Sequence, residues 1–273
     1  MNISELFDLH GRTALITGGS GVLGRVMASG LAQAGARVAV LGRREAPALD
    51  VAASIRATGG EAIGVAADVL ARTALERANE SITATLGPAD ILINGAGGNS
   101  PQATTGAEPR FFDLEMEAIR HVFDTNVIGA IVCSQVFGRV MADRQQGCIV
   151  NIASMAGLRP LTRVVTYSAA KAALINFTQW LAVHMAQEYS SAIRVNAIAP
   201  GFFLTEQNRY LMLDAEGKLT ARGQAIVSHT PAGRLGEPAD LLGTLFWLVS
   251  PASAFVTGVV IPVDGGFSSF SGV

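Results

Sequence analysis

The stretch from Thr13 to Gly24 reads Thr-Ala-Leu-Ile-Thr-Gly-Gly-Ser-Gly-Val-Leu-Gly. A short apolar run leads into a glycine-rich turn, and an amphipathic pattern from Leu23 to Ala34 follows. Strand, tight turn and helix in this order form the start of a parallel βαβ unit, in which backbone N–H groups at the helix N-terminus can bind a pyrophosphate. The residues from Gly19 to Gly24 also match the pattern G-x-G-x-x-G. The stretch therefore predicts a dinucleotide-binding turn.

Further apolar runs of strand length follow this unit, and longer helical patterns separate them. The runs are Thr13 to Thr17, Arg37 to Leu41, Ala62 to Ala66, Ile91 to Asn94, Cys148 to Ile152, Arg194 to Ile198 and Val256 to Val263. Prominent helical patterns are Leu23 to Ala34, Glu115 to Met141 and Tyr167 to Tyr189. Runs that are apolar on both faces are typical of parallel strands covered by helices on both sides. We predict an α/β fold: a doubly wound, Rossmann-type parallel sheet of seven strands with helices on both faces.

The composition is that of a globular protein. The 273 residues include 49% hydrophobic and 15% charged residues, which is enough apolar material for a large core and excludes a disordered chain. No linker divides the sequence, so we expect a single domain over residues 1–273. The 20 Lys and Arg residues oppose 22 Asp and Glu residues, a net charge of −2 without basic clusters. A nucleic-acid partner is not expected.

Other features bear on the compartment of the protein. The uncharged stretch from Leu241 to Val263 is long enough to cross a bilayer, but Pro251 interrupts it, so we expect a buried helix followed by a strand and no membrane span. Cys133 and Cys148 have no CxxC spacing, and the N-terminus lacks a cationic leader. We expect a reduced, cytoplasmic protein. The four histidines show no ligand spacing, so no catalytic metal is predicted.

Ligands of doubly wound sheets bind at the carboxyl ends of the strands, so residues that follow each strand are candidates. The second strand ends without the acid that would bind the ribose of NAD, and Arg43 and Arg44 stand there instead. Guanidinium groups suit the 2′-phosphate of NADP, so NADP(H) is favoured. NAD(H) stays possible, because Glu45 can reach the ribose. Asp68 can bind the adenine amino group or, as an alternative, cap the following helix.

Four polar residues indicate the chemistry. Tyr167 and Lys171 lie one helical turn apart on the same face. A buried ammonium group beside a phenol is expected to lower the phenol's pKa from its usual value of about 10, which makes it a proton donor or acceptor. Ser154 follows the fifth strand and can bond a substrate carbonyl oxygen. Asn126 stands among apolar residues, where an amide needs a buried partner or a functional reason.

The order and spacing of these motifs resemble the short-chain dehydrogenase/reductase family over essentially the whole chain. The resemblance rests on the glycine turn, Asp68, Asn94-Gly95-Ala96-Gly97, Asn126, Ser154, Tyr167, Lys171, and Pro200-Gly201 followed by Thr205. It implies that Tyr167 is the acid/base and that Lys171 holds the nicotinamide ribose and tunes the phenol. It also implies that Ser154 orients the carbonyl and that Asn126 anchors a water in a proton relay. The implied assembly is a homotetramer built through the two long helices and the C-terminal strand.

Residues from both lines of argument make up the predicted cofactor site. They are Gly18, Gly19, Ser20, Gly21, Val22, Leu23, Gly24, Arg43, Arg44, Asp68, Val69, Asn94, Gly95, Ala96, Gly97, Tyr167, Lys171, Pro200, Gly201 and Thr205. The sequence departs from the family pattern at Val22, where glycine is usual. This leaves open whether Gly19 or Gly21 touches the phosphate.

Several stretches resemble, more narrowly, the D-mannonate oxidoreductase or fructuronate reductase subgroup. They are Asn94 to Asn99, Arg159 to Arg163, Asn176 to Met185, Phe202 to Arg209 and Asp264 to Val273. A sugar acid would account for polar residues in these stretches, since guanidinium groups bind carboxylates in a bidentate manner. The predicted substrate-binding residues are Asn99, Ser154, Arg159, Arg163, Gln207, Asn208 and Arg209. Each arginine is equally open to interpretation as a surface or subunit-contact residue.

The resemblance implies hydride transfer between NADP(H) and a sugar acid, with D-fructuronate reduced reversibly to D-mannonate. The segment from Gln207 to Thr230 is then expected to be a substrate lid. Alternative substrates are another keto-uronate, a keto-gluconate or a 3-oxoacyl thioester. A non-catalytic NADP-binding regulator is an alternative of another class.

Overall fold

The computed structural model describes residues 3–205 and 209–272. Within them the strands form one parallel sheet in the order β3-β2-β1-β4-β5-β6-β7. The strands are β1 Thr13–Thr17, β2 Arg37–Gly42, β3 Ala62–Ala66, β4 Ile91–Asn94, β5 Gly147–Ile152, β6 Ile193–Pro200 and β7 Val260–Val263. The chain starts in the middle of the sheet, builds outward to β3, and then returns to build the other half. The predicted Rossmann-type fold is confirmed.

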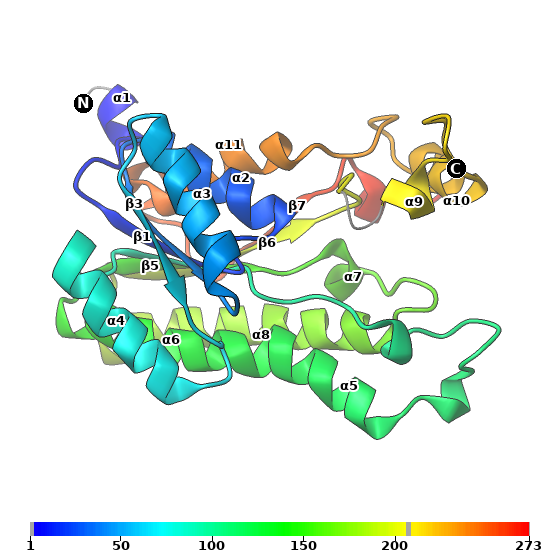
Figure 1. The fold of residues 1–273 in the computed structure, drawn as a ribbon, viewed down its shortest axis with the longest axis horizontal. Coiled ribbons are helices and arrows are strands. Elements are labelled where there is room, and N and C mark those ends of the chain that lie inside the picture. The colour runs from blue at the N-terminus through cyan, green and yellow to red at the C-terminus, as the bar shows by residue number, and fades with distance from the viewer. Residues whose placement is uncertain (1–2, 206–208, 273) are drawn as a thin grey trace.

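Helices cover both faces of this sheet (Figure 1). One face carries α2 (Val22–Gln33), α3 (Glu45–Ala57) and α11 (Leu242–Val249), and the other carries α4 (Arg72–Leu86), α6 (Gly129–Asp143) and α8 (Val165–Glu188). Shorter helices are α1 Ile3–Leu6, α5 Met116–Phe123, α7 Met155–Leu158, α9 Arg209–Met212 and α10 Ala221–Ser228. A π-helical turn spans Asp124–Ile128, and 3-10 turns span Pro101–Ala103, Phe111–Asp113, Pro238–Leu241, Pro251–Ser253 and Phe267–Ser269.

The core has two halves, one on each side of the sheet. Neighbouring side chains on β1 show this division: Ile16 packs with Met27 of α2, whereas Leu15 belongs to the cluster that contains Phe137 of α6. Successive side chains of a strand point to opposite faces, so a strand buried on both sides needs apolar residues at every position. All residues of β1 and β4 are buried, while the edge strands β3 and β7 are partly exposed.

Two elements differ from the prediction. The last strand was expected from Val256 and begins only at Val260. Before Val260 the Gly258 N–H still donates to the Val195 carbonyl oxygen, and the Asn196 side chain adds two bonds: its amide donates to the Val256 carbonyl and its oxygen accepts from the Val259 N–H. Gly258, at φ +76°, also leaves the extended region.

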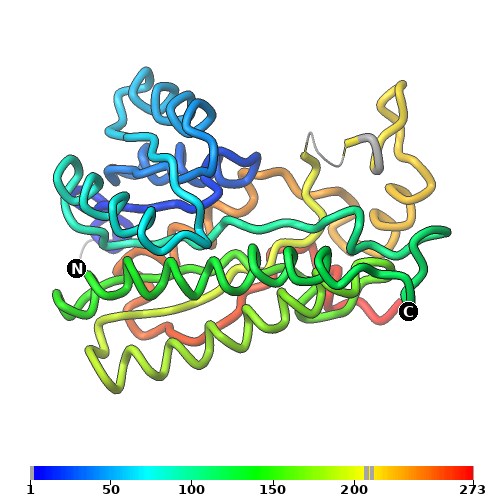
Figure 2. The backbone as a smooth tube through the Cα atoms, turned by 60° about the horizontal axis from the view of Figure 1, so that its bottom comes forward, coloured from blue at the N-terminus to red at the C-terminus, as the bar shows by residue number. Residues whose placement is uncertain are grey.

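The long helix expected from Glu115 to Met141 is interrupted by the π turn at Asp124–Ile128. Its full extent, Met116–Asp143, is long and apolar enough to cross a membrane by length and composition, but half of its most apolar window is buried within the fold. It runs beside α8 along the length of the molecule (Figure 2). The stretch from Leu241 to Val263 forms helix α11, a turn and strand β7, as predicted.

Candidate active site

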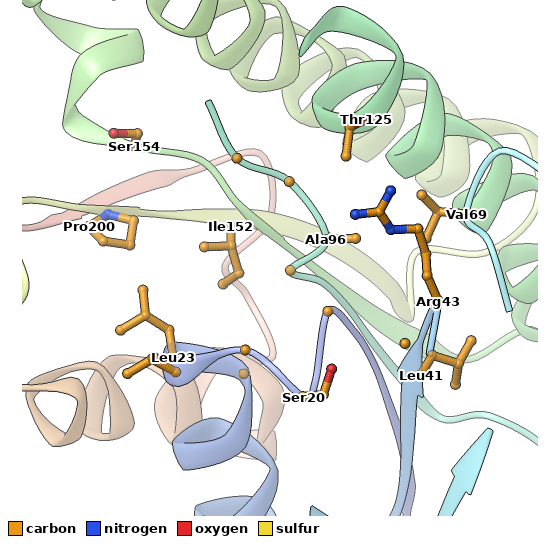
Figure 3. Close-up of a pocket in the computed structure, with 18 of the residues that line it drawn as sticks. Ser20, Leu23, Leu41, Arg43, Val69, Ala96, Thr125, Ile152, Ser154 and Pro200 are labelled. Atoms are coloured by element: carbon orange, nitrogen blue, oxygen red, sulfur yellow. The ribbon is translucent and has the colours of Figure 1, made fainter. Parts of the chain in front are cut away.

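The carboxyl ends of the strands border a cleft of about 960 Å³. Figure 3 shows it extending from Ser154 and Pro200, past Ile152 and Ala96, to Leu41, Arg43 and Val69. Most of the predicted residues line it. These are Gly18, Ser20, Gly21, Val22, Leu23, Gly24, Arg43, Arg44, Asp68, Val69, Gly95, Ala96, Gly97, Ser154, Tyr167, Lys171, Pro200, Gly201 and Thr205.

Close backbone packing shapes the glycine turn. Gly18 has φ +66°, and a Cβ atom there would lie 2.8 Å from the Gly95 carbonyl oxygen. A Cβ atom on Gly24 would lie only 2.3 Å from the Gly18 carbonyl oxygen. Helix α2 begins at Val22, with Gly21 exposed beside it, so the N–H groups of the first helical turn border the cleft. This cradle fits a pyrophosphate.

Thr17 joins this turn to the neighbouring glycine loop. Its hydroxyl oxygen accepts hydrogen bonds from the N–H groups of Gly95 (3.2 Å) and Ala96 (3.1 Å). Our sequence analysis treated Thr17 only as the end of a strand. The sequence signal that could have revealed this role is a hydroxyl residue at the last position of β1, the strand that pairs with β4.

The far end of the cleft is cationic. Arg43 and Arg44 are exposed there, and in Figure 3 the Arg43 side chain extends over the cleft toward Thr125. Among the described residues Asp68 is the one acidic side chain that lines the cleft, and Glu45 does not. The Asp68 carboxylate accepts from the Leu70 N–H at 3.0 Å, whereas helix α4 begins at Arg72. Asp68 is therefore not the cap of that helix.

Gly19 and Asn94 were predicted to bind the cofactor but do not line the cleft. Gly19 is buried under the turn. The Asn94 side chain points below the cleft floor, where its amide donates to Ser134 Oγ (3.1 Å) and Asn151 Oδ1 (2.8 Å). Asn94 is the last residue of strand β4 and still belongs to the sheet, whereas the loop that borders the cleft starts at Gly95.

Ser154, Tyr167 and Lys171 meet at the other end of the cleft. The Lys171 ammonium group donates to the Ile152 carbonyl oxygen at 2.8 Å and lies 5.6 Å from the centre of the Tyr167 ring. The Ser154 hydroxyl caps α7 by accepting from the Ala156 N–H at 3.1 Å, and its interaction with the Tyr167 side chain lowers the pKa of that phenol. The arrangement can hold a carbonyl oxygen and transfer a proton to it.

A glycine that our sequence analysis did not single out lets the two helices of this cluster approach. A Cβ atom on Gly157 of α7 would lie 2.7 Å from the Lys171 carbonyl carbon of α8. The close contact brings the segment that carries Ser154 against the one that carries Tyr167 and Lys171. Sequence alone offers no signal for such a contact, because the partner backbone is brought to it only by the fold.

Burial sets the protonation of this cluster. It raises the pKa of the Tyr167 phenol, and the hydrogen bond to Ser154 opposes this effect only in part. The expected lowering by Lys171 is wrong, because loss of hydration dominates the pKa of the phenol and the opposing effect comes from Ser154. Burial also lowers the pKa of Lys171 to about 8.

Asn126 occupies the π turn and is completely buried. Its amide donates to the Gly98 (2.7 Å) and Val122 (2.8 Å) carbonyl oxygens, and its own oxygen accepts from the Gly98 N–H at 3.1 Å. It does not line the cleft, but it ties the glycine loop after β4 to the helix. The buried partner that a core amide requires is thus the loop backbone.

Among the described residues, four of the predicted substrate residues do not line the cleft: Asn99, Arg159, Arg163 and Arg209. Asn99 bonds Thr104 within its own loop at 2.8 Å, and the Arg159 guanidinium donates to the Ser268 carbonyl oxygen at 3.4 Å. Arg163 has φ +72° and accepts through its carbonyl oxygen from the Thr105 N–H. Arg209 is exposed at the start of α9. Gln207 and Asn208 lie outside the described residues. Polar and aromatic lining residues that we did not predict are His121, Thr125, Phe202 and Phe203.

Comparisons with known proteins agree with this geometry. Residues 12–215 match the family model for short chain dehydrogenase. UxuB, an uncharacterised oxidoreductase of Bacillus subtilis (strain 168), is 49% identical over 97% of this chain and 98% of its own length.

Solved structures give the same picture. A protein from Haemophilus influenzae, provisionally assigned as a D-mannonate oxidoreductase and solved with bound NAD, is 43% identical over all of both chains, with a TM-score of 0.92. A gluconate 5-dehydrogenase from Burkholderia cenocepacia J2315, in complex with NADP and tartrate, is 32% identical over 98% of this chain and 99% of its own, with a TM-score of 0.88.

Proposed function

The chain belongs to the short-chain dehydrogenase family and is an NAD(P)-dependent oxidoreductase, and we propose that it reduces D-fructuronate reversibly to D-mannonate. The observation that carries the proposal is the cluster of Ser154, Tyr167 and Lys171 at the end of a dinucleotide-shaped cleft. Similarity to proteins named for mannonate and gluconate supports a sugar acid as the substrate class.

The proposed chemistry divides among the three side chains. The Ser154 oxygen already accepts from a backbone N–H, and its O–H group would donate to the ketone oxygen. Tyr167 donates a proton to the same oxygen as negative charge develops on it, and the ammonium group of Lys171 stabilises the resulting phenolate. A bound reduced nicotinamide supplies the hydride. The raised pKa of Tyr167 keeps the phenol protonated at neutral pH, so it can act as the acid of the reductive direction.

The residues that would hold the cofactor follow from the cleft. The glycine turn and the N-terminus of α2 would bind the pyrophosphate, Asp68 and Val69 the adenine, and Lys171 the nicotinamide ribose. We propose NADP(H) as the preferred cofactor, because Arg43 and Arg44 are the charged groups at the adenosine end that suit a 2′-phosphate. Pro200, Gly201 and Thr205 would line the nicotinamide.

We further propose that the chain acts as one domain, with residues 207–230 as a substrate lid. A single sheet that contains strands from both halves of the sequence supports this. Exclusion of water by a lid would strengthen the polar contacts to the substrate. An arginine would bind the carboxylate, and Arg159, Arg163 and Arg209 are the candidates.

A cytoplasmic homotetramer built through the long helices and the C-terminal strand also remains a proposal. Apolar side chains exposed on α5 and α8 support it, with Met116 60%, Trp180 58% and Val183 56% exposed. Both cysteines are buried and unpaired, as in a reducing compartment. Sedimentation equilibrium of the purified protein tests the assembly, and a stable monomer would contradict it.

Initial rates of NADPH and NADH oxidation test the proposed reaction. D-fructuronate is assayed beside D-tagaturonate, 5-keto-D-gluconate and a 3-oxoacyl thioester. We expect selective turnover of fructuronate with NADPH. Turnover of a keto-gluconate alone would identify a different sugar acid as the substrate. Cofactor binding without any turnover would favour a non-catalytic NADP-binding regulator.

A further inference from the structure

The C-terminal segment Asp264–Phe270, here called the tail, has no role in the chemistry above. It lies at the same end of the molecule as α9 and α10 in both Figure 1 and Figure 2. We propose that the tail is a positioning element of the substrate site, which holds Arg159 and the end of lid helix α10 in place for binding of the sugar acid. The proposal rests on the proposed function.

The tail starts against the cleft. The Gly201 N–H, in a residue that lines the cleft, donates to the Val263 carbonyl oxygen at 2.9 Å, and a Cβ atom on Gly201 would lie 2.6 Å from Asp264 Cβ. The Asp264 carboxylate then accepts from the N–H groups of Gly266 (2.9 Å) and Ser268 (2.8 Å). These bonds fix the turn, so the tail leaves the sheet in one defined direction.

Two aromatic rings of the tail hold the end of the lid helix. His229, the residue that caps α10 at its C-terminus, contacts the ring of Phe267 at 4.7 Å and that of Phe270 at 5.0 Å between centroids. Phe267 also contacts Phe202, which lines the cleft, at 5.1 Å. Edge-to-face contacts of this kind are directional, so they fix where the helix ends relative to the cleft.

The tail also contacts the residues that follow α10, from Thr230 to Ala232. The Ala232 N–H donates to the Gly265 carbonyl oxygen at 3.0 Å, and a cavity of about 220 Å³, bordered by Thr230, Gly265 and Phe203, lies beside it. Backbone packing continues beside the cavity, since a Cβ atom on Gly265 would lie 2.8 Å from Thr230 Cγ2 and one on Gly266 would lie 3.1 Å from Pro231 Cγ. The aromatic contacts of His229 add a directional attachment to this packing.

The tail also reaches the segment that follows Ser154. Arg159 ends helix α7, which Ser154 caps, and its Nε–H donates to the Ser268 carbonyl oxygen at 3.4 Å. Of the three candidate arginines, Arg159 is thus the one whose guanidinium is oriented by the tail. Groups that fix the orientation of a binding side chain raise affinity by lowering the entropy lost on binding.

The test uses the full-length enzyme, with KM and kcat for D-fructuronate and the Kd for NADPH measured separately. We expect Phe267→Ala and Phe270→Ala to raise KM about tenfold, which corresponds to about 1.4 kcal/mol. The kcat and the Kd for NADPH are expected to change less than about twofold, because neither residue belongs to the cofactor cleft. Phe255→Ala, at a fully exposed ring on another loop, is the matched control.

His229 separates aromatic packing from other roles of the residue. We expect His229→Ala to raise KM like the tail variants, and His229→Phe to restore a value near that of the wild type. Loss of function in His229→Phe equal to that in His229→Ala would overturn the packing role. An unchanged KM in Phe267→Ala and Phe270→Ala would overturn the proposal as a whole. So would a fall in kcat and a weaker binding of NADPH that accompany the rise in KM.

Hydrogen exchange of α10 distinguishes failure of this proposal from failure of the proposed function. The tail variants are expected to accelerate exchange of its amides at least about tenfold while the strands keep their protection. Wild-type enzyme that turns over no sugar acid would refute the proposed function, and the exchange result would still decide whether the tail holds the lid. Unchanged exchange would show that it does not.

Discussion

At the scale of single residues, burial decides what the reacting groups do. Lys171 is buried and donates to the Ile152 carbonyl oxygen, so its charge is held at a fixed place and its pKa falls to about 8. The Tyr167 phenol responds to the same environment in the opposite direction, because burial always disfavours the charged form. Lys171 therefore loses its proton more easily than a lysine in water, and Tyr167 loses its proton less easily than a tyrosine in water.

Replacement of Tyr167 by Phe removes the proposed proton donor and leaves the ring in place. We expect kcat to fall by about 10²- to 10⁴-fold, the usual contribution of a positioned acid. Fluorescence titration with NADPH should give a Kd close to that of the wild type. Near-normal turnover would exclude Tyr167 as the acid.

Single residues also set the charge at the adenosine end of the cleft. Arg43→Asp removes a cation and adds an anion that can bind a ribose hydroxyl, so we expect the ratio of kcat/KM for NADPH to that for NADH to fall by about 10- to 100-fold. Arg77→Asp, an equal change of charge at an exposed position of α4, is the control. An unchanged ratio would show that the 2′-phosphate is held elsewhere.

At the scale of elements, close backbone contacts give the site its shape. The turn after β1 and the loop after β4 are close enough that Gly18 tolerates no side chain, and α7 approaches α8 in the same way at Gly157. The π turn adds a second device, since it carries Asn126, which bonds the loop after β4. Such turns occur often at functional sites because they change the direction in which one side chain points.

Two glycine substitutions separate close contact from helix propensity. In Gly24→Ala the new methyl group would meet the Gly18 carbonyl oxygen at 2.3 Å, so we expect a loss of cofactor binding and of several kcal/mol of stability. Gly243→Ala changes an exposed position of α11 with no atom within 4 Å and should stabilise by about 0.5–1 kcal/mol. Urea denaturation measures both, and equal effects would refute the steric argument.

At the scale of the whole molecule, the arrangement that builds the site has a cost in stability. Burial of a charged group without a carboxylate partner is unfavourable, and Lys171 is such a group: its partner is a backbone carbonyl oxygen. The cost is present while the lysine is charged in the folded protein. Its pKa is lower in the folded than in the unfolded chain, so the unfolded state binds more protons above about pH 8.

The lowered pKa of Lys171 predicts a difference between the wild type and Lys171→Met in how the free energy of unfolding depends on pH. The free energy of unfolding of the wild type should rise relative to that of the variant from about pH 8 to about pH 10.5, by up to roughly 3 kcal/mol in total. Below pH 8 the difference should be constant. Urea unfolding of both proteins across this range measures it, and a difference that falls with pH would contradict the burial of a charged lysine.

The sequence by itself determined the positions of the strands along the chain, the class of the fold and the two ends of the cleft. The alternation of apolar runs with helical patterns depends only on local sequence. The same holds for the stretch from Thr13 to Gly24, whose motif can be recognised without knowledge of distant contacts. Tyr167 and Lys171 were found because one helical turn separates them. The strand boundaries were predicted within a few residues, apart from the start of β7.

Only the tertiary structure decided which polar side chains face the cleft. Asn94 turns under the sheet, Asn126 binds a loop and Arg159 bonds the tail, and each of these partners is distant along the chain. The direction of the Tyr167 pKa also required the structure, because hydration depends on what surrounds a group and not on its neighbours in sequence. Contacts between distant segments are set by packing of the whole chain, and no local pattern encodes them.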